Sequence, residues 1–561
     1  MSVSSLPFLH GALAAVLPKL AAWRRDFHAH PEAGWTEFRT AALIIRRLRE
    51  LGYAIRMGEA ACASDRRMGV PSSAVLAAAR ERALEHGADA ELVAGMGDGY
   101  TGFWADLDCG PGPVTAFRFD MDCNEVAECA EESHRPMREG FASRWPGLMH
   151  ACGHDGHAAV GLGLAEVLVS IRRHLRGRIR LIFQPAEEGA RGALPMSEAG
   201  AVDGVDVLFG FHIGFKAEGP GSLICGTQGF LATTKRDVLF SGVPAHAGAA
   251  PEEGKDALLA ACSAVVNLHA ISRNGKGGTR IAVGRLEGGE ARNVIPASAR
   301  LFMETRGETT ELDAYMTAES ERILRASADL WGCACEWRTV GNSAGGGSSP
   351  ELARLIATVA EAMGGWKTVI PMSGFGATED FACLMSRVQA SGGLASYLQV
   401  GTDRAAGHHS DRFDFDETCL GRALELLARL AVRMAGGGQE DTETETESDM
   451  EFLDEVVRRK GIHVQLWLEG EDGEGFGRGR VELLQLVDEL GSLSKAAKQL
   501  GMSYRGAWGK IKKAERIAGE TLVDASGTKR DGYSLTPAGR ELVQRFQQWY
   551  ADVESFAKKR A

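Results

Sequence analysis

The sequence predicts an α/β domain with a mainly parallel sheet, followed by a small C-terminal helical domain. Over most of the chain, apolar runs of strand length alternate with runs of helical periodicity, which is typical of α/β folds. Residues 436–449, "GGGQEDTETETESD", interrupt this alternation. Their like charges repel and they offer no apolar surface to bury, so we expect an extended linker between the two parts.

The overall composition limits the class of protein. With 561 residues, 44% of them hydrophobic, and a formal net charge of −12, the chain is typical of a globular protein with several cores. The negative charge argues against a protein that coats nucleic acid or a membrane surface, but it permits a local basic patch. No run of 18 apolar residues occurs, so we expect no membrane-spanning helix, and we expect no membrane partner. The 11 cysteines show no spacing framework and follow no secretory signal, which predicts reduced thiols in a cytoplasmic protein.

Two predicted strands end in acidic residues. Residues 112–122, "GPVTAFRFDMD", and 177–189, "GRIRLIFQPAEEG", are apolar runs of this kind. Residues 155–175 lie between them in the chain and have helical periodicity with a basic end, as helix C-termini prefer. Ligands of parallel sheets gather beyond the carboxyl ends of the strands. We therefore expect the acidic residues to lie close together there.

A cluster of metal-ligand residue types precedes this helix. In residues 149–163, "MHACGHDGHAAVGLG", Cys152 and His154 are separated by one residue in a glycine-containing loop, so both side chains can point at one centre. Cysteine, histidine and carboxylate are ligands of divalent ions, and hydrolytic sites keep one position for water. The adjacent Glu187 and Glu188 should point in different directions. One can then bind metal while the other takes a proton from water.

Further histidines follow later in the chain. His212 comes after an apolar run, and His408 and His409 form a doublet. A lone histidine is at least as often a structural residue as a ligand. Five segments with ligand-type residues at expected strand ends, taken together, favour a metal site.

Seven motifs resemble those of one known family and occur in the same order. The sequence resembles the zinc-peptidase-like amidohydrolases that include hippuricase and the auxin-conjugate hydrolases. Within them it is most similar to the aminobenzoyl-glutamate hydrolase branch. The resemblance covers about residues 15–435 and is carried by "RRDFHAHPEAGWTE", "FRFDMD", "MHACGHDGHAA", "FQPAEEGARGA", "AHAGAAPEEGKDAL", "RNVIPASARLFMETR" and "HSDRFDFDE".

This resemblance implies a metallopeptidase-type site with two divalent ions per subunit. Glu187 matches the general base. His408 falls outside the aligned position, although a switch within the doublet stays open, and His150 and His157 are expected to support the site. Manganese is favoured by the family branch, whereas a cysteine ligand favours zinc. The metal ligands that the resemblance implies are Cys152, His154, Glu188, His212 and His409.

The resemblance also implies an inserted α+β lid that serves dimerisation. The expected boundaries are 1–229 and 341–435 for the two parts of the catalytic domain, 230–340 for the lid and 450–561 for the C-terminal domain. His246 matches a lid histidine that stabilises the oxyanion in a partner's site. Asn293 and Arg306 match residues that hold the substrate carboxylate, which an arginine binds bidentately. From the residues alone, a surface ion pair is the simpler interpretation of Arg306.

The expected substrate is an N-acyl amino acid, with aminobenzoyl-glutamate or a similar N-aroyl compound favoured. The expected partners are a second copy of the chain, in a homodimer, and, as a further possibility, a separate B-type subunit. Both follow from the resemblance alone.

The C-terminal part predicts a winged helix-turn-helix domain. Residues 491–516 have the pattern helix, glycine turn, basic helix, and residues 520–542 that of a β-hairpin with a basic tip. The segment resembles the DNA-binding domain of ModE-type, molybdate-responsive regulators. Duplex DNA is the expected partner, and a charged helix that serves only dimerisation is the alternative. The candidate DNA-binding residues are Ser503, Arg505, Lys510, Lys512, Lys513, Lys529 and Arg530.

Two classes of function stay open at this point. The chain is either an active amidohydrolase with a DNA-binding appendage, or a transcription regulator whose hydrolase-like domain serves as a ligand sensor. Retention of Glu187 and of every ligand-type residue favours the enzyme.

Overall fold

The computed structural model forms two compact units, Met1–Leu453 and Asp454–Ala561, which are described separately. It describes residues 6–435, 467–469, 475–500, 502, 504–524 and 532–560. The predicted linker, residues 436–449, lies outside the described residues. The domain boundaries given above stay predictions.

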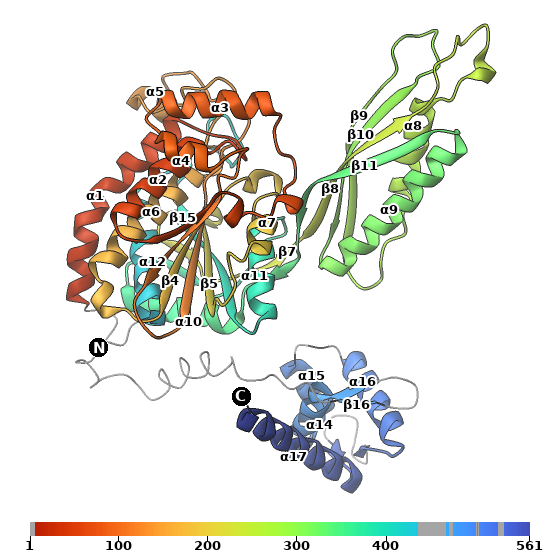
Figure 1. Ribbon diagram of the computed structural model, residues 1–561. Coiled ribbons are helices and arrows are strands. Elements are labelled where there is room, and N and C mark those ends of the chain that lie inside the picture. Colours follow the sequence, from red (N-terminus) through yellow and green to blue (C-terminus); the bar gives the residue numbers. More distant parts are fainter. Residues whose placement is uncertain are drawn as a thin grey trace. The chain divides into compact units, whose positions relative to one another are not determined.

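The large unit is built on an eight-stranded mixed sheet (Figure 1). In spatial order its strands are β1 (Ala54–Met57), β2 (Phe103–Asp108), β4 (Arg178–Gln184), β3 (Val114–Asp120), β5 (Val207–Glu218), β15 (Leu394–Thr402), β6 (Ser222–Ile224) and β13 (Thr368–Ile370). The central strands β4, β3, β5 and β15 are parallel, as expected from the alternating pattern. The antiparallel pairings of β1, β2 and β6 were not expected, but such strands often flank a parallel sheet.

Helices cover both faces of this sheet (Figure 1). On one face, α6 (His154–Ser170) packs between the sheet, α1 (Pro7–Ala29) and α12 (Thr418–Ala435). Gly161 lets α6 approach closely, because a Cβ there would lie 2.7 Å from the Phe119 ring of β3. On the other face, α7 (Ala193–Glu198) and α11 (Phe381–Ala390) share a core with the sheet. The helix that carries the first ligand residues is therefore held against the centre of the sheet.

Shorter elements complete the catalytic part. The helices are α2 (Phe38–Glu50), α3 (Ser73–Glu85), α4 (Ala90–Gly95), α5 (Arg135–Glu139) and α10 (Pro350–Met363), and the 3-10 turns are η1 (Gly58–Ala61), η2 (Ser64–Arg66), η3 (Arg172–His174) and η4 (Glu187–Gly189). A three-stranded sheet consists of β12 (Gly346–Gly347), β7 (Thr227–Phe230) and β14 (Ser373–Gly374).

A second, four-stranded antiparallel sheet corresponds to the predicted lid. In spatial order it consists of β11 (Ala334–Ser343), β8 (Ala232–Ser241), β10 (Ser298–Gly307) and β9 (Thr279–Gly288), with η5 at Pro251–Glu253. Two helices, α8 (Ala257–His269) and α9 (Thr310–Leu330), lie on one face and share its core (Figure 1). Side chains alternate between the faces of a strand. In β8, Arg236 therefore pairs with Glu321 of α9, and its neighbour Lys235 points to the face without helices.

The small unit is helical with a β-hairpin. It contains β16 (Trp467–Glu469), β17 (Gly475–Gly477), α14 (Arg478–Leu490), α15 (Leu493–Gln499), α16 (Tyr504–Ala518), β18 (Val523–Asp524), β19 (Ser534–Leu535) and α17 (Pro537–Arg560). One apolar core joins α14, α15, α16 and α17. The short turn between α15 and α16 and the antiparallel pair β18–β19 confirm the predicted helix-turn-helix with its hairpin.

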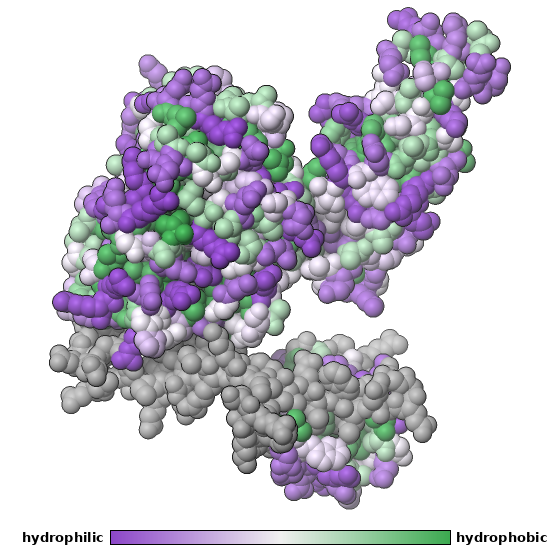
Figure 2. All heavy atoms as spheres, viewed as in Figure 1, coloured by the Kyte–Doolittle hydropathy of each residue, from purple (hydrophilic) through white to green (hydrophobic). Residues whose placement is uncertain are grey.

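No described helix is both long and apolar enough to span a membrane. On the visible face of the large unit, hydrophobic residues are interspersed with hydrophilic ones (Figure 2).

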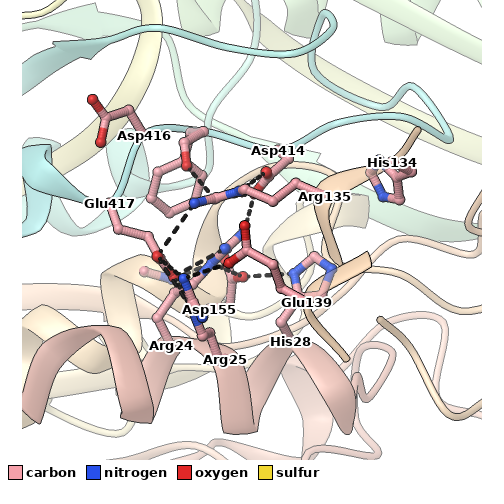
Figure 3. Close-up of polar contacts among 12 residues, drawn as sticks. Arg24, Arg25, His28, His134, Arg135, Glu139, Asp155, Asp414, Asp416 and Glu417 are labelled. Atoms are coloured by element: carbon pink, nitrogen blue, oxygen red, sulfur yellow. Dashed lines mark hydrogen bonds and ion pairs between the residues drawn. The ribbon is translucent and has the colours of Figure 1, made fainter. Parts of the chain in front are cut away.

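A buried arginine connects three distant segments of the large unit (Figure 3). Arg24 of α1 is fully buried. Its Nε donates to Asp155 of α6 at 2.8 Å, and its Nη2 donates to Asp414 at 2.8 Å. Asp155 directly follows His154, and Asp414 lies five positions after His409. Arg24 therefore holds together the two segments that carry candidate ligands.

Arg24→Met is expected to lower the free energy of unfolding of the large unit by about 3–5 kcal/mol, because it leaves Asp155 buried without its guanidinium partner and Asp414 paired with Arg135 alone. Arg25→Met is the matched control. Arg25 pairs with Glu139 and Glu417 nearer the surface, so its loss should cost about 0–1 kcal/mol. Urea titration of the full chain measures both. Equal losses for the two variants would contradict the role assigned to Arg24.

Candidate metal centre

The candidate ligands come together at the carboxyl edge of the main sheet. Glu187 and Glu188 form η4, just after β4, and His212 lies in the buried part of β5. Cys152 precedes α6, and His154 is its first residue. His409 lies in the loop before α12. Every metal-site segment singled out in the sequence therefore reaches one edge.

The ligand atoms of these residues form overlapping groups. Within each group they lie within 4.8 Å of one another: Cys152 with Glu188 and His409, Cys152 with His212 and His408, and His154 with Glu187 and Glu188. Two atoms bound to one ion at about 2 Å lie about 3–4 Å apart. The distances of 3.9 Å from His154 Nε2 to the nearest oxygens of Glu187 and Glu188 fit that spacing.

Hydrogen bonds to backbone carbonyls engage Nδ1 of two histidines and leave Nε2 near other candidate ligands. His154 Nδ1 lies 2.9 Å from the Asp122 carbonyl oxygen, and His212 Nδ1 lies 2.9 Å from the Ile213 carbonyl oxygen. A carbonyl only accepts, so both Nδ1 atoms donate, and in the neutral ring Nε2 is the nitrogen that carries the lone pair. This is the usual arrangement of metal-ligating histidines. His212 Nε2 lies 3.5 Å from Cys152 Sγ.

His157, by contrast, has no free nitrogen. Its Nδ1 lies 2.5 Å from an oxygen of Asp120, and its Nε2 accepts from the Ile213 amide at 2.9 Å. His157 is suited to tie α6 to β3 and β5 and not to bind an ion.

The two histidines of the doublet, His408 and His409, also differ in whether their ring nitrogens have partners. His408 Nδ1 lies 2.9 Å from Nη1 of Arg404, which can only donate, and His408 Nε2 lies 3.2 Å from the Ile213 carbonyl oxygen. Both nitrogens of His408 are therefore engaged. His409 adopts a positive φ of 65°, and its Nε2 lies 3.3 Å from Glu188. The backbone turn at His409 directs this ring toward the other candidate ligands.

Buried atoms without partners mark the centre. Among the described residues, His154 Nε2, Glu188 Oε1 and Asp122 Oδ1 are buried and make no hydrogen bond. Burial and the nearby Glu188 carboxylate raise the pKa of the Cys152 thiol well above its usual value. Buried polar atoms without partners are costly, and a thiolate is stable there only beside a cation. The donor set therefore fits divalent ions.

Glu187 lies beside a second acidic pair that the sequence analysis did not single out. Ligand-type oxygens of Glu187, Glu379 and Asp380 lie within 4.8 Å of one another. Burial, followed by the charges of Glu379 and Glu188, raises the pKa of Glu187 well above its usual value. A carboxylate with a raised pKa is suited to accept a proton. The only signal in the sequence was two adjacent acids in "ATEDFA".

A buried arginine balances this acidic pair. Arg118 of β3 is fully buried and donates to Asp120, Gln184, Glu379 and Asp380. Asp120 in turn contacts His157. The network lies under the catalytic edge, and sequence reasoning missed it, because an arginine within an apolar run gives no sign of its partners.

The lid residues lie outside these ligand groups. His246 is exposed, and its turn pairs with Asn293 and Val294: the Ala247 amide donates to the Asn293 carbonyl oxygen at 3.0 Å, and His246 forms a β-bridge with Val294. Arg306 of β10 donates through Nε to Glu304 at 2.8 Å. Arg306 therefore makes the ion pair that the residues alone suggested. Among the described residues, no hydrogen bond involves its two Nη atoms, so both can bind a ligand.

Of the candidate DNA-binding residues, the structure describes three side chains on α16. Lys510 and Lys513 are exposed, and Lys512 pairs with Glu515 at 2.7 Å. Ser503, Lys529, Arg530 and the side chain of Arg505 lie outside the described residues.

Comparison with known proteins agrees with this geometry. Residues 116–433 match the model of peptidase family M20/M25/M40, and residues 479–540 match that of bacterial regulatory helix-turn-helix proteins of the lysR family. The second match supports a helix-turn-helix but not the ModE type in particular.

Two curated relatives and one crystal structure extend the comparison. The chain is 46% identical to one of the subunits of p-aminobenzoyl-glutamate hydrolase from Escherichia coli, over 74% of this chain and 96% of that protein. It is 44% identical to indole-3-acetyl-aspartic acid hydrolase of Enterobacter agglomerans, over 76% of this chain and 98% of that protein. The crystal structure of an aminobenzoyl-glutamate utilization protein from Klebsiella pneumoniae is 40% identical, with a TM-score of 0.66 over 76% of this chain and 98% of that chain. The fold, the ligand set and these matches together show that the chain belongs to peptidase family M20/M25/M40, as a metal-dependent amidohydrolase.

Proposed function

We propose that the large unit hydrolyses the amide bond of N-acyl amino acids, with aminobenzoyl-glutamate as the favoured substrate. The observation that carries this proposal is the position of Glu187 beside overlapping groups of ligand atoms, several of them buried without partners. The sequence similarity of the chain to hydrolases of aminobenzoyl-glutamate and of indole-3-acetyl-aspartic acid supports this substrate class.

The proposed metal ligands are Cys152, His154, Glu188, His212 and His409. The overlap of the ligand groups supports two ions per subunit. When bound, divalent ions polarise the scissile carbonyl and acidify water. Manganese stays the favoured metal on the family resemblance, and the cysteine ligand keeps zinc as the alternative.

In the proposed reaction, Glu187 takes a proton from the attacking water and later delivers it to the leaving amine. His246 is prepared to stabilise the oxyanion. Its Nδ1 accepts from the amides of Gly248 and Ala249, both at 3.1 Å, so its proton resides on Nε2. An N–H donor fixed in this way suits a developing negative charge. His246 would act across a homodimer, with Asn293 and Arg306 holding the substrate carboxylate.

A second proposal concerns the small unit, which we infer binds duplex DNA through α16. The match to regulatory helix-turn-helix proteins and the exposed Lys510 and Lys513 support it. In such domains the second helix enters the major groove, and two domains at a fixed spacing bind together. A homodimer of the large unit would supply that pairing.

The wild-type protein, loaded with manganese, should release aminobenzoate from aminobenzoyl-glutamate, and Glu187→Gln should abolish turnover while metal content stays unchanged. The amide cannot accept a proton, but the proposed ligand set is intact. Product release and elemental analysis of the same preparations measure both properties. Substrate binding without hydrolysis by the wild type would instead favour the ligand-sensor function, and full activity of metal-replete Glu187→Gln would remove the base assignment.

The ligand assignment makes a separate prediction within the histidine doublet. Cys152→Ser and His409→Ala should each lower the bound metal per subunit, whereas His408→Ala should do so much less, because both His408 nitrogens already have partners. Elemental analysis after dialysis measures the difference. If His408→Ala loses more metal than His409→Ala, the assignment is shifted by one residue.

The DNA proposal is tested with the full chain and a pool of random duplexes. Lys510→Gln with Lys513→Gln should weaken binding to all sequences and lower the slope of log affinity against log salt by about one for each phosphate that is no longer neutralised. Arg505→Gln should relax sequence preference. Lys276→Gln, an exposed lysine of the large unit, is the matched control. If the wild type retains no duplex at low salt, dimerisation is left as the role of the tail.

A further inference from the structure

We infer that Arg191 and Lys235 bind the side-chain carboxylate of an acidic amino acid in the leaving half of the substrate. This inference rests on the proposed function and narrows it to N-acyl glutamates and aspartates. It assigns a role to two residues that the preceding sections leave unused.

Arg191 lies in the same tight loop as the proposed base. The Ala190 amide donates a hydrogen bond to the Glu187 carbonyl oxygen, and the Arg191 amide donates one to the Ala186 carbonyl oxygen at 3.1 Å. The guanidinium makes one hydrogen bond to protein, from Nη1 to the Gly69 carbonyl oxygen at 3.2 Å, and its Nε is buried without a partner. Across the described residues it forms no ion pair. A partly buried guanidinium without a counter-charge is costly, so an anion bound there would be stabilising.

Lys235 approaches the same loop from the lid. It lies in β8 on the face without helices, opposite Glu304 of β10 and Gly341 of β11. Its ammonium makes no ion pair among the described residues, because Glu304 instead accepts from Arg306. Its side chain runs past Gly341, at the point where β11 meets the backbone of Gly189. Lys235 therefore lies beside the loop that carries the proposed base.

The two cations border one point of contact between the lid and the catalytic loop. A Cβ at Gly341 would lie 2.3 Å from the Gly189 carbonyl oxygen and 3.1 Å from Cδ of Lys235. A Cβ at Gly189 would lie 2.1 Å from Nε of Arg191. Gly341 therefore lets the two backbones approach, and Gly189 leaves room for the Arg191 side chain. This contact places the lysine and the arginine on either side of Gly189, two positions after the proposed base.

Charge balance identifies the ligand. The centre itself has an excess of carboxylates, which divalent ions would offset, whereas Arg191 and Lys235 have no protein counter-charge among the described residues. A leaving amino acid always carries an α-carboxylate, for which Arg306 is already the candidate. In the leaving amino acid, an acidic side chain brings a second carboxylate, and a planar arginine fork with a lysine is suited to bind it. Both curated relatives are named for conjugates of acidic amino acids, aspartate and glutamate.

The test compares aminobenzoyl-glutamate with aminobenzoyl-glutamine, which has the same shape but a neutral side chain. The wild-type protein should prefer the glutamate conjugate in kcat/KM. Arg191→Met and Lys235→Met should each reduce that preference roughly tenfold to a hundredfold, as expected for the removal of a hydrogen bond to a charged group. Arg191→Lys, which keeps the charge, should retain part of the preference. Thermal unfolding of each variant reports its folding.

Matched controls remove one charge elsewhere. Arg46→Met and Lys276→Met change exposed residues away from the centre and should leave the glutamate preference unchanged. Equal losses on both substrates in Arg191→Met and Lys235→Met would show a structural role and overturn the inference. An equal rate of the wild type on both substrates would overturn it as well, with the proposed hydrolysis intact. No hydrolysis of any N-acyl amino acid would remove the proposed function and this inference together.

Discussion

The arrangement of the metal centre depends on Asp122, which fixes two of its parts at once. Its carbonyl oxygen accepts a hydrogen bond from His154 Nδ1, and its carboxylate accepts one from the backbone amide of Glu188 at 2.9 Å. The first hydrogen bond decides which nitrogen of His154 is left without a partner, and the second holds the loop that contains Glu187 and Glu188. A single residue just after β3 therefore orients a candidate ligand and fixes the loop of the proposed base. Histidine ligands generally need such a partner behind them.

Buried cations then keep this acidic edge stable. Arg118 lies beneath it and compensates Asp120, Glu379 and Asp380, while Arg24 compensates Asp155 and Asp414 behind α6. Removing one partner of a buried ion pair leaves the other charge uncompensated, which is destabilising. Each buried carboxylate in these networks therefore has a cationic partner. The large unit thus uses protein cations to neutralise the carboxylates that orient the site, and leaves the ligand carboxylates for metal.

Much of this architecture could be predicted, because its signals are local in the sequence. The apolar runs before Asp120 and Glu187 indicated the strands and their ends, and the motif order identified the family. The helix-turn-helix was visible as two short helices around Gly501. The buried networks were not predictable in this way. The sequence around Arg24, Arg118 or Arg191 does not indicate partners that lie far away in the chain. The direction of the flanking antiparallel strands depends on how the chain connects them, which hydrophobic periodicity does not show. For the histidine doublet, the family resemblance favoured His409 but left a switch to His408 open, and the backbone turn and the hydrogen bonds of His408 support His409.

The pairing of Arg24 with Asp414 has a consequence for how the protein is made. The two residues are separated by 390 positions, and Arg24 has left the ribosome long before Asp414 is added. At about 5–20 residues per second, the arginine waits about 20–80 s for that carboxylate. During this interval Arg24 has only Asp155 of these two carboxylates as a partner. The candidate metal centre therefore cannot be complete until nearly the whole large unit has been synthesised. A chain interrupted before that point lacks both the final ligand segment and the second carboxylate partner of Arg24.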